Sequence, residues 1–167
     1  MKQQLVVMGA SGSGKSTVGA ALAATLGLPF VDADDLHPIT NIDKMSAGIP
    51  LTDEDRWPWL RAVGEAIAAA DDTGVVVACS ALRRVYRDTI REKAPATRFV
   101  FLEGSRELLT ERLAAREGHF ASRTLLDSQL QTLEALESDE DGVTVSIEGE
   151  PQAIVARAEA ALTQSGS

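Results

Sequence analysis

An eight-residue segment near the start of the chain has the residue types and spacing of a phosphate-binding loop. Its glycines allow the backbone to curl so that successive N–H groups point inward, and the helix expected to follow adds partial positive charge. We expect Lys15 to act in catalysis by reaching the β- and γ-phosphates of ATP, and the Ser16 hydroxyl to coordinate Mg²⁺. The residues expected to bind ATP in this segment and just after it are Gly9, Ala10, Ser11, Gly12, Ser13, Gly14, Lys15, Ser16 and Thr17.

Carboxylates come directly after the second apolar run of the chain, at Asp32, Asp34 and Asp35. The carboxyl ends of parallel strands form the ligand-binding edge of an α/β sheet, so these acids should face the phosphates. One such acid can accept the proton of an attacking hydroxyl while another holds Mg²⁺ through water. We assign Asp34 as the general base, in contact with substrate, and Asp32 to the metal. An acidic surface turn that caps the next helix is the alternative for both, and it is the interpretation we prefer for Asp35.

Positive charge gathers after the third apolar run, where Ser80 is followed by Arg83, Arg84, Arg87 and Arg91. Because the chain has a net charge of −9, an anionic substrate must find such local positive charge. Arg87 is a candidate to contact a substrate carboxylate or phosphate. Solvated arginines on an amphipathic helix are an equally good interpretation at this stage.

A polar stretch at residues 113–125 has the character of a closing lid. Arg112 and Arg116 would bind ATP there, and Arg116 would stabilise charge on the transferring group as closure excludes water. Arg123 is a further candidate, and the sequence leaves open which lid arginine reaches the phosphate. His119 could equally be a surface residue. Neither His119 nor His37 is a convincing general base, because no neighbouring group that would orient either ring is identifiable.

The elements that must position these groups alternate along the chain. Short, continuously apolar runs predict strands at residues 4–8, 29–32, 75–79, 98–102 and 143–147, and helical spacing separates them, beginning with a helix over 15–26. This pattern predicts a doubly wound α/β fold: a parallel five-stranded sheet with helices on both faces and a helical lid. A capping-type stretch at 52–55 lies so close to Pro58 that its helix either kinks there or begins later. The acidic run at 138–142 is expected to be a solvated turn.

Composition bounds the remaining possibilities. The 167 residues suit one domain spanning 1–167, with 44% hydrophobic and 25% charged residues, as in ordinary globular proteins. The acidic balance disfavours binding to nucleic acid or to an anionic membrane surface. No apolar run approaches the length of a membrane span and no signal-peptide pattern is evident, so we expect a cytoplasmic location. The single cysteine, Cys79, cannot form an internal disulfide.

Ordered segments over residues 6–147 resemble the gluconate kinases, or gluconokinases. After the loop GASGSGKS, the segment DADDLHP at 32–38 is similar to that family's Asp-Gly-Asp-x-Leu-His signature, although Ala33 stands where glycine is usual. Further segments that match in order are NIDKM at 41–45, GIPLTDEDR at 48–56, PWL at 58–60, CSAL at 79–82, YR at 86–87, GHF at 118–120 and LLDSQ at 125–129. Glu117 departs from the family, which often has a basic residue there.

The resemblance implies ATP- and Mg²⁺-dependent phosphorylation of D-gluconate at its 6-hydroxyl, usually by a homodimer. It also implies a set of substrate-binding residues, with the basic members suited to the carboxylate and hydroxyls of the sugar acid. That set is Asp34, His37, Lys44, Arg56 and Arg87, and we add Ser80 and His119 as further candidates for substrate binding.

Shikimate kinase is the closest enzymatic alternative, since it too is a short P-loop protein that phosphorylates a hydroxylated carboxylic acid. The Leu-His-Pro, Lys-Met and Pro-Trp-Leu segments favour gluconate instead. A binding-only regulator would need neither a base near the γ-phosphate nor an arginine-bearing lid. A switch GTPase would need an Asn-Lys-x-Asp segment to recognise guanine, and the chain contains none.

Overall fold

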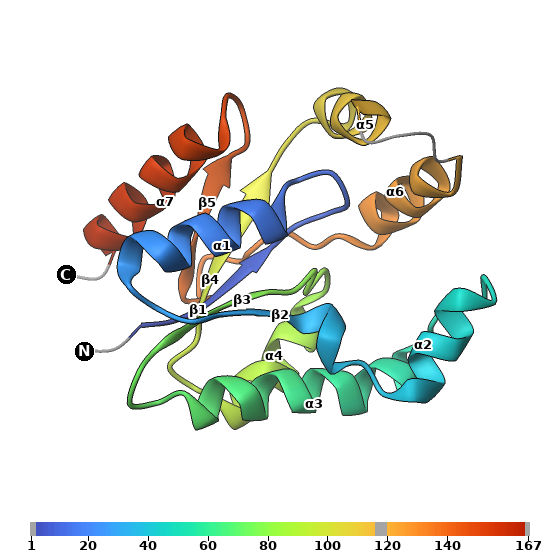
Figure 1. The fold of residues 1–167 in the computed structure, drawn as a ribbon, viewed down its shortest axis with the longest axis horizontal. Coiled ribbons are helices and arrows are strands. Elements are labelled where there is room, and N and C mark those ends of the chain that lie inside the picture. Colours follow the sequence, from blue (N-terminus) through green and yellow to red (C-terminus); the bar gives the residue numbers. More distant parts are fainter. Residues whose placement is uncertain (1–2, 116–119, 166–167) are drawn as a thin grey trace.

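A five-stranded parallel sheet forms the centre of the molecule (Figure 1). The computed structural model describes residues 3–115 and 120–165, with side chains described over 3–114 and 126–164. The strands lie in the order β2-β3-β1-β4-β5, and every neighbouring pair is parallel. Their bounds are β1 Gln4–Met8, β2 Phe30–Asp32, β3 Val75–Ala78, β4 Arg98–Glu103 and β5 Gly142–Ser146. All five predicted strands are confirmed, each within one residue at either end.

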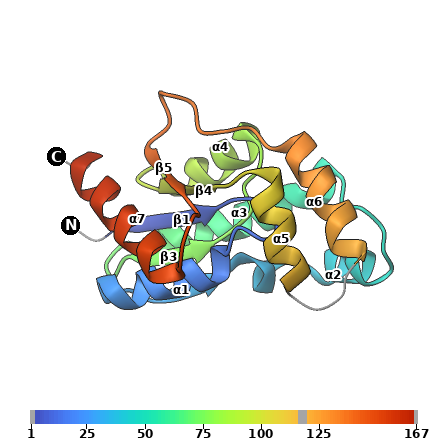
Figure 2. The ribbon, with the colours of Figure 1, turned by 90° about the horizontal axis from the view of Figure 1, so that it is seen from above.

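Helices cover both faces of the sheet, which confirms the doubly wound fold. In Figure 1, α1 and α7 lie on one face and α3 and α4 on the other, while α5 and α6 stand beyond the carboxyl ends of the strands; Figure 2 shows the same layers from above. The helices are α1 Lys15–Leu26, α2 Ile39–Ser46, α3 Asp53–Ala69, α4 Arg84–Lys93, α5 Arg106–Ala115, α6 Phe120–Thr132 and α7 Pro151–Ser165, and a short 3-10 helix, η1, spans Ala33–Leu36. No helix in the described part is long and apolar enough to cross a bilayer.

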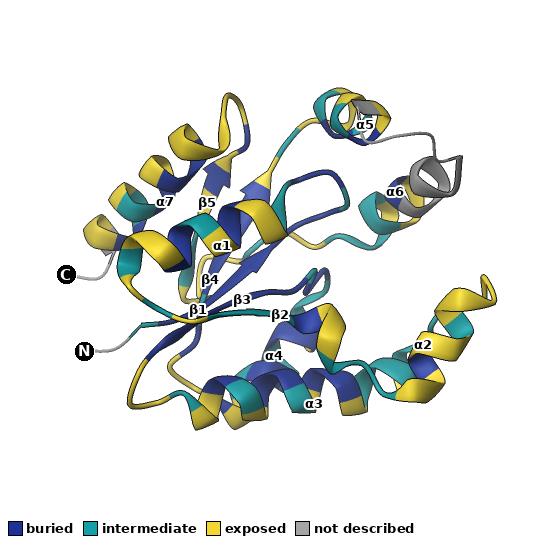
Figure 3. Ribbon diagram, in the orientation of Figure 1, coloured by how far each residue is buried: buried dark blue, intermediate teal, exposed yellow. Residues whose placement is uncertain are grey.

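Two apolar cores sandwich the sheet because successive side chains of a strand point to opposite faces. On β1, Leu5 and Val7 belong to the core shared with α1 and α7, whereas Val6 and Met8 belong to the core shared with α3 and α4. All four side chains are fully buried, and Figure 3 shows the central strands buried along their length. A strand that is apolar at every position therefore has a buried partner on each side.

The ambiguity at the start of α3 is resolved in favour of the early cap. Thr52 accepts a hydrogen bond from the Asp55 amide, and the Asp55 carboxylate accepts one from the Thr52 amide, so the two form a reciprocal capping box. The helix then runs from Asp53 to Ala69 with Pro58 inside it. Pro58 has no N–H to donate, but the cap and the buried face of the helix hold this segment helical.

The expectation of a solvated acidic turn at 138–142 is wrong for one residue. Asp139 and Asp141 are exposed as expected, but the Glu140 side chain is fully buried. Its carboxylate accepts hydrogen bonds from Arg87 Nε at 2.7 Å and Arg91 Nη2 at 2.6 Å. A buried carboxylate requires such partners, because an unpaired charge in the interior is costly.

Candidate active site

The phosphate-binding loop leaves β1 and turns directly into α1. Gly14 is the N-cap of α1 with φ of 86°, and no side chain caps the helix, so its first N–H groups remain available to an anion. Gly12 also has φ of 86°, and a Cβ there would lie 2.9 Å from the Leu109 carbonyl of α5. The loop is therefore both curled and packed closely against the helix that leads into the predicted lid.

Two oxygen-bearing side chains meet beside this loop. The Ser16 hydroxyl donates a 3.0 Å hydrogen bond to Asp32 Oδ2, and Asp32 Oδ1 accepts one from the Asp34 amide, also at 3.0 Å. Hydroxyl and carboxylate oxygens are the ligands that Mg²⁺ prefers, and Mg²⁺ commonly takes only one or two protein ligands in addition to phosphates and water. In the part of the chain that is described, no group of three or more His, Cys, Asp or Glu side chains could hold a metal. The pair Ser16–Asp32 fits a phosphate-bound Mg²⁺ rather than a separate metal centre.

Asp34 lies in η1, two residues after Asp32, and the groups around its carboxyl suit a residue that accepts a proton. Partial burial raises the pKa of its carboxyl, and the neighbouring charge of Asp32 raises it further. Lys15 and His37 act in the opposite direction and lower that pKa. The Asp34 carboxyl therefore lies within electrostatic range of Lys15, which follows the glycines of the phosphate-binding loop.

His37 is held in place by contacts on two sides. Its ring stacks on the Trp59 indole with centroids 4.1 Å apart, and its Nδ1 lies 3.1 Å from Asn41 Nδ2. Burial lowers the pKa of His37, which favours the neutral ring. Trp59 in turn donates to the Ala33 carbonyl at 2.7 Å, so this buried indole ties α3 to the turn that carries Asp34. Sequence reasoning used Trp59 only as part of the PWL segment at 58–60 and did not anticipate this support.

The two predicted substrate cations on the α2–α3 side are already paired with acids. Lys44 Nζ contacts both oxygens of Asp55 at 2.9 Å. Arg56 Nη1 lies 3.3 Å from Asp53 Oδ1 and 3.3 Å from the Tyr86 hydroxyl. Both side chains keep about a third of their surface exposed, at 39% for Lys44 and 30% for Arg56. The acids hold the cations in position and leave surface from which either can meet an anion.

A polar cluster that sequence reasoning did not assign joins α3 to the N-terminus of α4. Asp53 accepts hydrogen bonds from the Tyr86 hydroxyl at 2.6 Å and from Arg83 at 2.9 Å, in addition to Arg56. The hydrogen bond from Tyr86 and the nearby arginines lower the pKa of Asp53. The only signal in the sequence was that Asp53 and Tyr86–Arg87 fall inside segments of the family resemblance. Their meeting depends on how α3 packs on α4.

Ser80 lies at the expected edge, but Arg87 does not face it as a substrate ligand. In the sheet, Ala78 pairs with Val7 of β1 on one side and with Asp32 of β2 on the other. Ser80, two residues further along the chain, therefore emerges between the phosphate-binding loop and the turn that carries Asp32 and Asp34. Arg87 is fully buried and bound to Glu140 and to the carbonyls of Ala81 and Ala135. The expectation that Arg87 touches substrate is therefore corrected, because its buried guanidinium is hydrogen-bonded to other residues of the chain.

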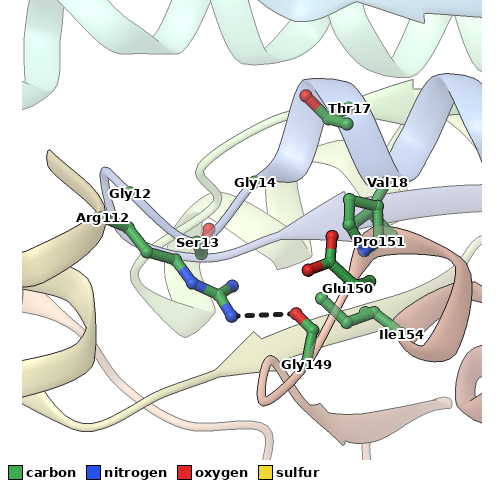
Figure 4. Close-up of a pocket in the computed structure, with 10 residues that line it drawn as sticks. All are labelled: Gly12, Ser13, Gly14, Thr17, Val18, Arg112, Gly149, Glu150, Pro151 and Ile154. Atoms are coloured by element: carbon green, nitrogen blue, oxygen red, sulfur yellow. Dashed lines mark hydrogen bonds between the residues drawn. The ribbon is translucent and has the colours of Figure 1, made fainter. Parts of the chain in front are cut away.

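A cavity of about 320 Å³ opens on the other side of the phosphate-binding loop (Figure 4). Arg112, expected to bind ATP, lines it and donates from Nη2 to the Gly149 carbonyl at 3.1 Å. Sequence reasoning missed the opposite wall, although a Gly-Glu-Pro segment between the last strand and the last helix was a usable signal. The residues that line the cavity are Gly12, Ser13, Gly14, Thr17, Val18, Arg112, Gly149, Glu150, Pro151 and Ile154.

Gln129 on α6 is a further neighbour of the phosphate-binding loop that was not assigned a role. Its Oε1 accepts a 2.6 Å hydrogen bond from the Ser11 amide. The residue ends the LLDSQ segment at 125–129, which carried part of the resemblance. The helix that follows the predicted lid is thus connected directly to the tip of the loop.

Comparison with known proteins places this geometry in a family. The chain matches the family model described as shikimate kinase over residues 11–159. It is 46% identical over 155 residues to a gluconokinase of Gluconobacter oxydans, covering 90% of this chain and 86% of that one. It is 44% identical over 144 residues to the thermosensitive gluconokinase of Escherichia coli, covering 84% and 76%. The crystal structure of a gluconokinase from Sinorhizobium meliloti superposes with a TM-score of 0.89 at 52% identity, covering 97% of this chain and 92% of that one.

The chain belongs to the gluconokinase family.

Membership in the gluconokinase family makes the chain an ATP-dependent kinase and confirms the resemblance that its segments carried. The shikimate kinase of Aquifex aeolicus superposes with a TM-score of 0.64 at 17% identity, which shows a shared fold and no more. This chain therefore shares its fold with the alternative enzyme class considered from the sequence.

Two of the expected site residues, Arg116 and His119, lie outside the described residues. The same holds for Glu117, and the side chains of residues 115–125, which include Arg123 and most of the predicted lid, are not described. The roles assigned to them stay predictions.

Proposed function

We propose that this chain transfers the γ-phosphate of ATP to the 6-hydroxyl of D-gluconate, giving 6-phospho-D-gluconate and ADP. The observation that carries the proposal is the position of Asp34, beside Lys15 and the Ser16–Asp32 pair, in a chain of the gluconokinase family. Phosphoryl transfer depends mainly on positioning the reactants and on stabilising charge. The proposed site combines the phosphate-binding loop, the Lys15 cation and the Asp34 carboxylate for these tasks.

In the proposed reaction, the 6-hydroxyl oxygen attacks the γ-phosphorus as Asp34 accepts the hydroxyl proton. The bond between the γ-phosphorus and the oxygen that bridges it to the β-phosphate breaks, and ADP leaves with that oxygen. Lys15 and the N–H groups at the start of α1 stabilise the negative charge on the transferring group. Each of these roles acts on a different atom of the reacting centre.

Ser16 and Asp32 are proposed to hold Mg²⁺, Ser16 through its hydroxyl and Asp32 through a water molecule. When bound, Mg²⁺ neutralises charge on the β- and γ-phosphate oxygens. A 3.0 Å hydrogen bond between the two side chains already holds their oxygens close together.

The remainder of the nucleotide is proposed to lie in the cavity beside Arg112. Its volume of about 320 Å³ is at the small end of ligand pockets, and the phosphate-binding loop forms one of its walls. Arg112 holds this wall to the loop before α7 through its hydrogen bond to Gly149 (Figure 4).

The acceptor is proposed to lie on the opposite side of the loop, among His37, Lys44, Arg56 and Ser80. A carboxylate with several hydroxyls suits this set, because two cations and neutral donors are offered together. The stack of the half-buried His37 ring on the buried Trp59 indole, with the bond from Trp59 to the Ala33 carbonyl, holds the turn that carries Asp34.

A homodimer in the cytoplasm is proposed on the resemblance to the gluconokinases. Light scattering on the purified protein tests the dimer, and a monomeric mass at working concentration would contradict it.

Coupled measurement of ADP release and product mass tests the activity itself. The enzyme is given MgATP with gluconate, with shikimate or with no acceptor. We expect ADP release that depends on gluconate, together with a monophosphorylated product. Transfer to shikimate alone, or ADP release without an acceptor, would contradict the proposal and indicate another small-molecule kinase or a nucleotide-hydrolysing regulator.

A further inference from the structure

Ala81 has a backbone conformation that its side chain disfavours. Its φ is 43°, and it is the only non-glycine residue in the described part of the chain with positive φ. In this region the Cβ crowds the backbone, so an alanine stays there only if its surroundings hold it. Ala81 comes directly after Ser80, at the sheet edge that carries the proposed acceptor site. We call residues 80–83 the acceptor loop.

One side chain holds the carbonyl of this strained residue. Arg87 Nη1 donates to the Ala81 oxygen at 2.8 Å from a position with no solvent exposure. The same guanidinium binds Glu140 through a second edge, with Nε to Oε1 at 2.7 Å and Nη2 to Oε2 at 3.0 Å. Because a guanidinium is planar and rigid, a two-point contact on one edge fixes the direction in which the other N–H groups point.

Glu140 is itself firmly held. It accepts hydrogen bonds from Arg91 at 2.6 Å and from the Glu137 amide at 2.9 Å. Burial alone would raise the pKa of Glu140. The hydrogen bonds from Arg87, Arg91 and the Glu137 amide instead lower this pKa to about 2, so the carboxylate is charged at neutral pH. The acceptor loop is further joined to this region by the Glu134 amide, which donates to the Leu82 carbonyl at 2.7 Å.

We propose that Glu140 is a positioning residue for the acceptor loop: through Arg87 it holds the Ala81 carbonyl, and so keeps Ser80 placed for the acceptor. The inference rests on the proposed function, because the loop must contact gluconate for its position to matter. Glu140 contacts neither substrate and acts only through Arg87.

Glu140→Gln tests this with little change in shape. The amide cannot bind the guanidinium at two charged points, so Arg87 loses its fixed orientation and Ala81 is free to leave its strained conformation. We expect kcat/KM for gluconate to fall about 10- to 100-fold, as small misplacements of reacting groups do, while KM for ATP changes less than about twofold. Asp141→Asn is the matched control: this neighbouring carboxylate is 63% exposed and pairs with Arg98, so the kinetics of the variant should match the wild type.

Rescue by glycine separates positioning from stability. Glycine adopts positive φ without penalty, so in Glu140→Gln combined with Ala81→Gly the loop no longer needs Arg87 to hold it. We expect the double variant to regain most of the gluconate kcat/KM while its Tm stays as low as that of Glu140→Gln. If Glu140 served stability alone, Tm would fall and the glycine would recover nothing.

If Glu140→Gln does not fold, Ala81→Val tests the same link with the buried ion pair intact. A β-branched side chain at positive φ should displace the loop and lower gluconate kcat/KM selectively, while Ala81→Gly stays close to wild type. Normal gluconate kinetics in Glu140→Gln or in Ala81→Val, or an equal loss toward both substrates, would overturn the inference. A wild-type enzyme without gluconate-dependent ADP release would instead overturn the proposed function on which it rests.

Discussion

The Ser16 hydroxyl and the Asp32 carboxylate are joined by a 3.0 Å hydrogen bond, although they come from the first turn of α1 and the end of β2. β3 separates β2 from β1 in the sheet, so this contact links the helix that follows β1 to the end of a strand that is not a neighbour of β1. The contact brings a hydroxyl at the start of α1 together with the first acid of the turn that carries Asp34.

Asp32→Asn should weaken the response to Mg²⁺ more than it disturbs the turn. Asparagine retains an oxygen that can accept from the Asp34 amide, but it lacks the charge that holds a hydrated cation. We expect the Mg²⁺ concentration for half-maximal activity to rise about 10- to 100-fold, as for other outer-sphere ligands. Titration of activity with Mg²⁺ measures this, with Asp35→Asn as the control. Unchanged Mg²⁺ dependence would show that Asp32 serves only to cap the turn.

Lys15→Ala should remove a cation that contacts charge at the γ-phosphate. The loss of one such donor typically costs about 3 kcal/mol of transition-state stabilisation, or about 10²- to 10³-fold in kcat/KM. Steady-state kinetics with saturating Mg²⁺ measure the loss. Lys93→Ala, which removes an exposed lysine at the end of α4, controls for the change in net charge. Near-normal kcat/KM in Lys15→Ala would rule out its assignment.

Asp34→Asn should suppress transfer without preventing ATP from binding, because the base acts on the acceptor. General-base catalysis contributes about 10²- to 10⁴-fold, so kcat should fall by that order. Turnover and calorimetric titration with ATP, measured on the same preparation, separate the two effects. Loss of ATP affinity with normal turnover would indicate a metal-binding or structural role for Asp34 instead.

The raised pKa of Asp34 also predicts how pH affects activity and stability. The folded chain binds this proton more tightly than the unfolded chain, whose carboxyl titrates near 3.8, so ionisation above the folded pKa destabilises the fold. Asp34→Asn should therefore have a Tm at pH 7 equal to or above that of the wild type, with the difference vanishing below pH 3.8. The acid limb of kcat/KM in the wild type should begin above 3.8. A lower Tm at pH 7 would contradict this sign.

Arg112→Ala should affect the nucleotide and leave the acceptor untouched. The variant loses the hydrogen bond to the Gly149 carbonyl and the cation that lines the cavity. Hydrogen bonds to charged groups contribute about 1.5–3 kcal/mol, so KM for ATP should rise about 10- to 100-fold while KM for gluconate stays constant. Arg61→Ala, on the exposed side of α3, is the control. A rise in the KM for gluconate would instead indicate that Arg112 acts on the acceptor side of the phosphate-binding loop.

Features with a local physical cause were predictable. The helix over Lys15–Leu26 has its predicted bounds, since Gly27 with φ of 70° ends it and the phosphate-binding loop begins it. The buried strands were recognisable because a strand covered on both faces must be apolar at every position. Pro58 was not decidable, because whether a helix tolerates proline depends on its cap and on the surface it packs against.

The sequence by itself therefore determined the sheet, the phosphate-binding loop and the acids after β2, since each follows from periodicity or from chemistry within a few residues. Only the tertiary structure decided which charges are buried. Arg87 resembled a substrate ligand and Glu140 a solvated acid, but they form one buried ion pair although 53 positions separate them. Burial is a property of how α4 packs against the segment before β5, and no local pattern carries it. For the same reason, the wall that residues 149–151 form in the cavity beside Arg112 emerged only once α7 was placed against α1.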